Sequence, residues 1–282
     1  MFDVGNYNEL VADEFTTHGL FFVNENVQDK RILLPGVELS QREIQIGEKL
    51  NLFVYLDSEN RPTVTLKKPH LTLFTFGYLY IKDLNQLGAF ADCGLPKDLF
   101  IPYRELSESV AQGNYAIVFM YFDTETKRLV GTTRVNAVLS NEKIDLTVGQ
   151  EVDAMVWKRT DLGYKLILND LYEGLVFHSD IFKDIQIGQK LKAYIKQIRP
   201  DNKIDVSFQK IGEDQIKEDA YFIYGELLKN EGKLPYSDKS DPDAIKERFA
   251  LSKKAFKRAI GSLYRDKKIQ IEEDSILLVK KN

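Results

Sequence analysis

Alternating hydrophobic and polar residues recur in the same order along the first three quarters of the chain. The segments 43–50 and 184–191 read EIQIGEKL and DIQIGQKL, and an alternating run follows each of them, at 51–56 and 192–198. Such alternation predicts half-buried β-strands. A turn and another alternating strand then close each copy, at 62–66 and 203–208. A looser middle copy keeps the same order, with a strand at 115–122 that resumes from 127 after a turn.

A glycine in a strand rich in large hydrophobic residues precedes each copy, at Gly19, Gly88 and Gly163, and a further short strand follows it. Short strands at regular spacing, separated by turn residues, are typical of small barrels repeated in tandem. The pattern therefore predicts three five-stranded β-barrels, and we place them at residues 1–67, 68–146 and 147–212.

The periodicity changes to that of helices after residue 213. Ala220, Ile223, Leu227 and Leu228 form a predicted apolar stripe, while Asp241-Pro242 and Ser252 begin two further helices. The third helix buries one side and carries basic residues on its other sides. Two short apolar segments, 269–271 and 276–279, predict a two-stranded hairpin after it. Three helices and a hairpin predict a winged helix-turn-helix domain at 213–282, so the chain is mainly β with an α C-terminal domain.

Charge is unevenly distributed, although the chain as a whole carries a formal net charge of −4. An acidic chain is a poor general binder of polyanions, because phosphate binding depends on cations that displace counterions. Residues 1–67 are the most acidic part, whereas residues 253–268 contain seven Lys and Arg against Asp266 alone. The predicted third helix of the C-terminal domain is therefore a candidate nucleic-acid contact.

Three segments of the repeat resemble the signature of the S1 RNA-binding domain, which is an OB-fold: Gly88-Ala89-Phe90, Gly174-Leu175-Val176 and Ile187–Leu191. The S1 pattern has an aromatic residue after the strand-two Gly-Ala, and Phe21 and Phe90 keep it, whereas Lys165 does not. The S1 pattern also has a histidine on its third strand. We expect Leu34, Ile101 and Phe177 to occupy the position of this histidine in the three copies, and His178 then lies one residue after it.

The order of modules, three S1-type barrels followed by a winged helix, resembles the conserved virulence factor B family of bacterial regulators. The resemblance implies an RNA-binding protein that engages single-stranded RNA and acts in post-transcriptional regulation. OB-folds stack bases on exposed aromatic rings, and the third helix of a winged helix contacts phosphates and bases. The candidate RNA-binding residues on the barrels are Phe21, Phe90, Tyr103, Tyr164, Phe177 and His178; those on the winged helix are Lys253, Lys254, Lys257, Arg258 and Arg265.

Enzymes and metalloproteins are disfavoured by the sequence. It contains no Gly-rich phosphate loop, nucleophile elbow or His-Glu-x-x-His pattern, and its three histidines and Cys93 lie apart. We expect no catalytic residue, metal or cofactor, no membrane span, and a cytoplasmic location. Two alternatives remain open: a DNA-binding transcriptional regulator that uses the winged helix, although the acidic segment 272–274 in its wing would repel phosphates, and a protein-interaction adaptor with degenerate barrels.

Overall fold

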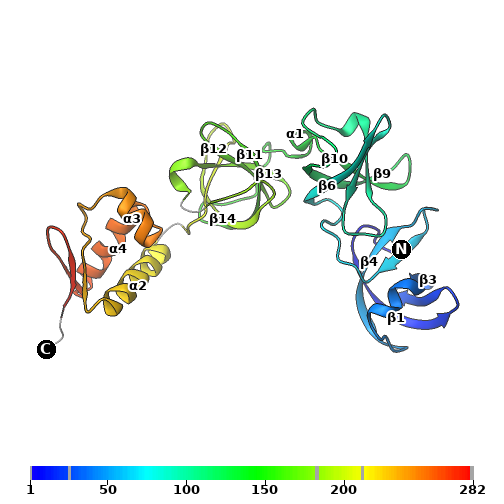
Figure 1. Ribbon diagram of the computed structural model, residues 1–282, viewed down its shortest axis with the longest axis horizontal. Helices are drawn as coiled ribbons and strands as arrows, with labels where there is room; N and C mark the ends of the chain where they lie inside the picture. The colour runs from blue at the N-terminus through cyan, green and yellow to red at the C-terminus, as the bar shows by residue number, and fades with distance from the viewer. Residues whose placement is uncertain (1, 25–26, 182–183, 211–212, 280–282) are drawn as a thin grey trace. The chain divides into compact units, whose positions relative to one another are not determined.

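The computed structural model describes residues 2–24, 27–181, 184–210 and 213–279, which divide into two compact units, residues 1–139 and 140–282. The first unit contains two barrels, and the second contains a third barrel and the helical domain (Figure 1). The predicted boundaries at 67/68 and 146/147 fall in segments without helix or strand. The boundary at 212/213 adjoins residues 211–212, which lie outside the described residues.

Barrel 1 and barrel 3 are closed five-stranded barrels with the same connectivity, in which the third strand pairs in parallel with the fifth. A short 3-10 helix follows the third strand in each, at Gly36–Gln41 and His178–Asp180. The strands of barrel 1 are β1 (Tyr7–Thr16), β2 (Gly19–Asn24), β3 (Val27–Pro35), β4 (Lys49–Leu56) and β5 (Pro62–Thr65); those of barrel 3 are β11 (Glu151–Arg159), β12 (Gly163–Leu168), β13 (Tyr172–Phe177), β14 (Lys190–Ile198) and β15 (Ile204–Ser207).

Barrel 2 has the same strand order, but no described ladder joins its third and fifth strands, so its sheet is open. These strands still lie side by side, because a Cβ at Gly131 would be 2.9 Å from the side chain of Ile101. The elements are β6 (Phe76–Asn85), β7 (Gly88–Asp92), β8 (Leu99–Pro102), a 3-10 helix (Tyr103–Glu105), β9 (Tyr115–Asp123), β10 (Arg128–Thr132) and the short helix α1 (Val135–Val138).

The repeated glycines begin the second strand of each barrel. A Cβ at Gly19, Gly88 or Gly163 would lie about 2 Å from a carbonyl oxygen of the third strand: 2.0 Å from Leu34, 2.1 Å from Ile101 and 1.9 Å from Val176. Their φ angles, +146°, +152° and +158°, are also ones that other residues rarely adopt. Glycine is thus required at this point by the close approach of the two strands.

The same register corrects the expected alignment of the third strands. The three glycines pair with Pro35, Pro102 and Phe177. Proline therefore stands in barrels 1 and 2 where Phe177 stands in barrel 3, and the prediction for Leu34 and Ile101 was wrong by one residue. Both of these side chains point inward and are fully buried.

Barrels 1 and 2 share a buried junction. Phe53 and Tyr55 on β4 of barrel 1 pack into the hydrophobic core of barrel 2, against residues such as Leu79 and Ile81. The amide of Leu73 also donates a 2.7 Å hydrogen bond to the carbonyl of Gly5. Burial, together with the negative charges of Glu38 and Asp57, raises the pKa of Tyr55 to about 12. The two barrels thus depend on each other for part of their buried surface.

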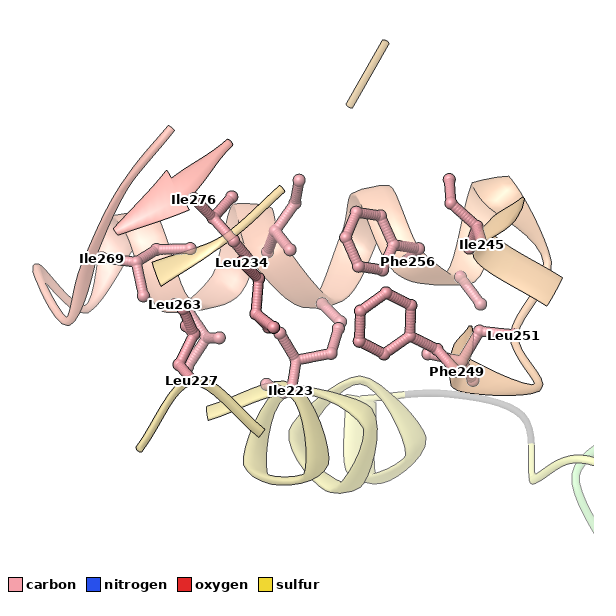
Figure 2. Packing of buried hydrophobic residues seen from close by; sticks show 14 residues of the cluster. Ile223, Leu227, Leu234, Ile245, Phe249, Leu251, Phe256, Leu263, Ile269 and Ile276 are labelled. Atoms are coloured by element: carbon pink, nitrogen blue, oxygen red, sulfur yellow. The ribbon is translucent and has the colours of Figure 1, made fainter. Parts of the chain in front are cut away.

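The C-terminal domain is a winged helix whose core is drawn in Figure 2. Phe249 and Phe256 lie with their ring centroids 5.1 Å apart and their planes tilted by 32°, and Ile223 and Leu227 of α2 belong to the same core. Leu228 is 59% exposed, contrary to the predicted stripe, because it lies about 100° around the helix from Leu227. The elements are α2 (Glu213–Lys229), β16 (Lys233–Leu234), α3 (Pro242–Phe249), α4 (Lys253–Arg265), β17 (Ile269–Ile271) and β18 (Ile276–Leu278).

The predicted hairpin is part of a three-stranded sheet, in the order β16-β18-β17. Sequence reasoning missed β16 because two residues show no alternation. None of the helices that the structure describes has the length and apolar character needed to cross a membrane.

Asp241 caps α3, and its side chain accepts hydrogen bonds from the amides of Asp243 (2.9 Å) and Ala244 (3.2 Å). We expect Asp241→Ala to lower the free energy of unfolding of this domain by about 1 kcal/mol, because both amides lose their acceptor. Urea denaturation followed by circular dichroism measures the change. Asp241→Asn, which keeps an acceptor, should remain close to the wild type; equal losses in both variants would contradict the role of the cap.

Candidate nucleic-acid interface

A groove of about 570 Å³ in barrel 2 is lined by residues of β8 and β10, and Phe90 of β7 also lines it. Alternation along β7 and β8 directs Ala89, Ala91 and Ile101 into the core and leaves Phe90 and Phe100 outside. The two phenylalanines face each other across the strands, with ring centroids 5.2 Å apart and a 43° angle between the rings. Half-buried aromatic rings of this kind can stack on bases.

Phe100 was not among the candidate residues predicted from the sequence. The signal that could have found it is its position two residues before Pro102 on an alternating strand, which places both on the outer face. Tyr103 follows Pro102 and is 67% exposed. Its amide donates to the carbonyl of Leu87, at the turn that borders the groove. Tyr103 thus lies beside the groove rather than in its lining.

Barrel 3 carries charged pairs where barrel 2 carries aromatic rings. Lys165 occupies the position of Phe90 and pairs with Glu173 at 2.7 Å in a groove of about 420 Å³. Arg199 donates two hydrogen bonds to Asp205, at 2.8 and 2.9 Å, and its guanidinium lies 5.7 Å from the ring centre of Phe177. The cations of this face are therefore already neutralised by neighbouring carboxylates.

The remaining barrel candidates are dispersed. Tyr164 packs partly against the core of barrel 3 and makes an edge contact with the exposed His178, with ring centroids 5.8 Å apart. Nε2 of His178 is 3.2 Å from the carbonyl of Thr160. In barrel 1, Phe21 is half-buried on β2 opposite Leu33, without an aromatic neighbour across the strands. Among the predicted barrel residues, Phe90 thus pairs with Phe100 and Tyr164 with His178, whereas Phe21 faces no aromatic ring across the strands.

Helix α4 presents one exposed stripe in which residues recur every three or four positions. Its members are Lys254, Lys257, Arg258, Tyr264 and Arg265, with the half-buried Gly261 between them, whereas Phe256, Ile260 and Leu263 face the core. Lys257 pairs with Asp238 at 3.3 Å. In the part of the chain that the structure describes, Lys254, Arg258 and Arg265 have no carboxylate partner within ion-pair distance.

Lys253 lies at the edge of this stripe. Its Nζ donates a 3.3 Å hydrogen bond to the carbonyl of Lys239, in the loop before α3. Four of the five predicted basic residues therefore share one face, and Lys253 is turned toward the loop.

The acidic tip of the wing is fixed to the same loop. Lys239 pairs with Glu273 at 2.9 Å, and the buried hydroxyl of Ser237 donates a 2.6 Å hydrogen bond to the carbonyl of Glu273. Glu272 accepts a hydrogen bond from the hydroxyl of Ser275. The wing tip thus remains negative beside the first turn of α4, and positive charge dominates the rest of the helix. Among the described residues, no cluster of three His, Cys, Asp or Glu side chains could hold a metal ion.

Family models match both ends of the chain. A model described as an S1 domain matches residues 4–67, and one described as a CvfB-like winged helix domain matches residues 222–278. The S1 match therefore falls on barrel 1, whose outer face has a single aromatic residue at the predicted positions, Phe21.

Whole-chain relatives share the name Conserved virulence factor B. The protein from Staphylococcus epidermidis is 29% identical over 273 residues, which cover 90% of this chain and 92% of that protein. The one from Staphylococcus aureus is 28% identical over 246 residues, or 85% and 82% of the two chains. A crystal structure described as a multidomain protein with nucleic acid binding domains, from Streptococcus pneumoniae, aligns over 98% of both chains at 22% identity and a TM-score of 0.41. With S1-type barrels, a winged helix and relatives that match along nearly its whole length, the chain is similar throughout to the proteins named Conserved virulence factor B.

Proposed function

We propose that this protein is a non-catalytic RNA-binding regulator that acts in the cytoplasm on single-stranded RNA. The observation that carries the proposal is the stripe on α4, which concentrates unpaired cations on an otherwise acidic chain. Cations that meet phosphates release condensed counterions, and this release supplies most of the sequence-independent affinity for nucleic acid. A net charge of −4 is therefore compatible with a local binding surface.

The aromatic groove of barrel 2 supports a single-stranded ligand, because bases must be unstacked from a duplex before they can stack on protein rings. Phe90 and Phe100 are the proposed stacking pair. Among the other predicted residues, Tyr164 is partly packed against the core, and we assign it a supporting role. We assign peripheral contacts with the RNA to the remaining four, which are Phe21, Tyr103, Phe177 and His178.

The regulatory part of the proposal rests on the similarity to proteins named Conserved virulence factor B. A protein that binds RNA without a catalytic site can change the access of other factors to that RNA. Post-transcriptional control is the role that this chemistry favours.

Fluorescence anisotropy titrations test the binding. We expect an unstructured RNA oligonucleotide to bind at low salt and to lose affinity as salt rises, with a slope of roughly −0.7 per phosphate contact for a single strand. Matched duplex DNA should bind more weakly, since Glu272 and Asp274 at the wing tip repel a second phosphate strand. Absence of RNA binding at low salt would refute the proposal.

A DNA-binding regulator is the second candidate, and α4 is the feature that favours it, since such a helix can enter a major groove. Tighter binding of duplex DNA than of RNA in the same titrations would establish this alternative. An adaptor role would instead leave both nucleic acids unbound.

A further inference from the structure

The groove on barrel 2 has a wall that comes from barrel 1. Tyr55, Leu56 and Asn60, from the β4–β5 hairpin of barrel 1, line it together with Phe90 and Phe100 of barrel 2. Tyr55 is only 5% exposed, because it packs into the core of barrel 2. The hairpin is therefore anchored at its base beside the stacking pair.

The tip of this hairpin is ordered by Asp57. One oxygen of its carboxylate accepts hydrogen bonds from the amides of Glu59 and Arg61, both at 2.9 Å, and the other pairs with the guanidinium of Arg61 at 2.8 Å. Burial alone would raise the pKa of Asp57, but the hydrogen bonds from Arg61 hold that pKa below its ordinary value. Asn60 adopts a left-handed φ of 62° within this turn and lines the groove. Its neighbours Glu59 and Arg61 are held in place by their hydrogen bonds to Asp57.

Two cations line the groove without a carboxylate of their own. Lys97 donates its hydrogen bond to the backbone carbonyl of Asp57, at 3.1 Å, and no acidic side chain pairs with Arg128 among the described residues. Asp98, which also lines the groove, is paired with Lys82 at 2.7 Å. Burial and the nearby charge of Arg128 lower the pKa of Lys97. An anion between Lys97 and Arg128 would relieve their repulsion.

We propose that the β4–β5 hairpin of barrel 1 completes a binding pocket for one nucleotide on barrel 2. The base stacks on Phe90 and Phe100, the phosphate lies between Lys97 and Arg128, and the amide of Asn60 hydrogen-bonds the polar edge of the base. The volume of about 570 Å³ lies within the range of small-molecule sites. This inference rests on the proposed RNA binding but assigns barrel 1 a different role, since barrel 1 forms a wall of the site on its neighbour.

Anisotropy titrations of the full chain with a short single-stranded RNA test the pocket. We expect Lys97→Gln/Arg128→Gln to lower the affinity about tenfold or more, since two charge-assisted contacts are lost. Lys127→Gln is the matched control, because this exposed neighbour of Arg128 does not line the groove. Its affinity should stay within about threefold of the wild type, as expected for one distant surface charge. The single variants Lys97→Gln and Arg128→Gln change the net charge by as much as the control does. If each of them lost no more affinity than Lys127→Gln, the phosphate site would be overturned and only a general charge effect would remain.

Asn60→Gly tests the contribution of barrel 1, because glycine keeps the left-handed turn and removes only the amide. We expect about a threefold loss of affinity, with an unchanged circular dichroism spectrum and melting temperature. Wild-type affinity in this variant would overturn the role of barrel 1.

Titration with a nucleoside 5′-monophosphate, followed by NMR, distinguishes the pocket from the proposed RNA binding. If the nucleotide shifts the resonances of Phe90 and Phe100 but RNA does not bind, the pocket stands and the proposed RNA binding fails. If RNA binds to the wild type and the nucleotide shifts neither ring, the pocket fails.

Discussion

Gly163→Ala is expected to destabilise barrel 3 by about 3 to 5 kcal/mol, close to the upper range for single substitutions. The new methyl group would lie 1.9 Å from the carbonyl oxygen of Val176 and 2.9 Å from Cα of Phe177. Both neighbours are backbone atoms, so the clash can be relieved only if β12 and β13 separate. Their separation would break hydrogen bonds of the ladder and expose part of the core. Urea denaturation of the full chain, followed by tyrosine and tryptophan fluorescence, measures the loss.

Gly149→Ala provides the control in the same barrel. Gly149 also has a positive φ, +88°, but a Cβ there would meet no atom within 4 Å. Only the backbone penalty remains, which is about 1 to 2 kcal/mol. If both variants lost the same free energy of unfolding, the contact with the third strand would not be the reason for glycine at position 163.

Lys254→Glu/Arg258→Glu is expected to lower the affinity for RNA on the order of tenfold to a hundredfold at low salt, because two attractive contacts become repulsive. Both side chains lie on the exposed stripe of α4 and have no carboxylate partner in the described structure. The salt dependence should also become shallower, by roughly 0.7 for each phosphate contact that is lost. Anisotropy titrations over a series of salt concentrations measure both quantities.

A comparison of Lys233→Glu with Arg258→Glu distinguishes the contribution of the α4 stripe to RNA affinity from that of the overall net charge. Lys233 is an exposed residue of β16 in the same domain, so the two variants change the net charge equally. We expect Arg258→Glu to reduce affinity about tenfold and Lys233→Glu about threefold at most. Equal losses would show that the domain attracts RNA through its total charge and that α4 is not a specific contact.

Much of the fold could be predicted from the chain because its determinants are local. Alternation located most of the strands, and Asp241-Pro242 and Ser252 marked the starts of α3 and α4. Features that depend on distant partners were missed. β16 exists only through pairing with β18, and the position of Pro35 and Pro102 opposite the glycines depends on strand register.

The candidate site was predictable to a smaller extent for the same reason. The basic stripe on α4 follows from helical periodicity, so four of its members could be found in the sequence. Phe100 and Arg128, in contrast, join Phe90 through the folding of one sheet, and Asn60 comes from another barrel. Alternation along β8 could have placed Phe100 on the outer face, but no local pattern links Arg128 or Asn60 to Phe90.

The glycine contact that recurs in all three barrels also bears on how the repeats can diverge. It fixes the fold through backbone atoms and inward-facing side chains, and it places no demand on the outward residue two positions later. That position is Phe21, Phe90 and Lys165 in the three copies. The same scaffold therefore tolerates a different outward residue in each barrel, an aromatic ring in barrels 1 and 2 and a lysine in barrel 3, so the surface of one barrel can change without any change in its fold.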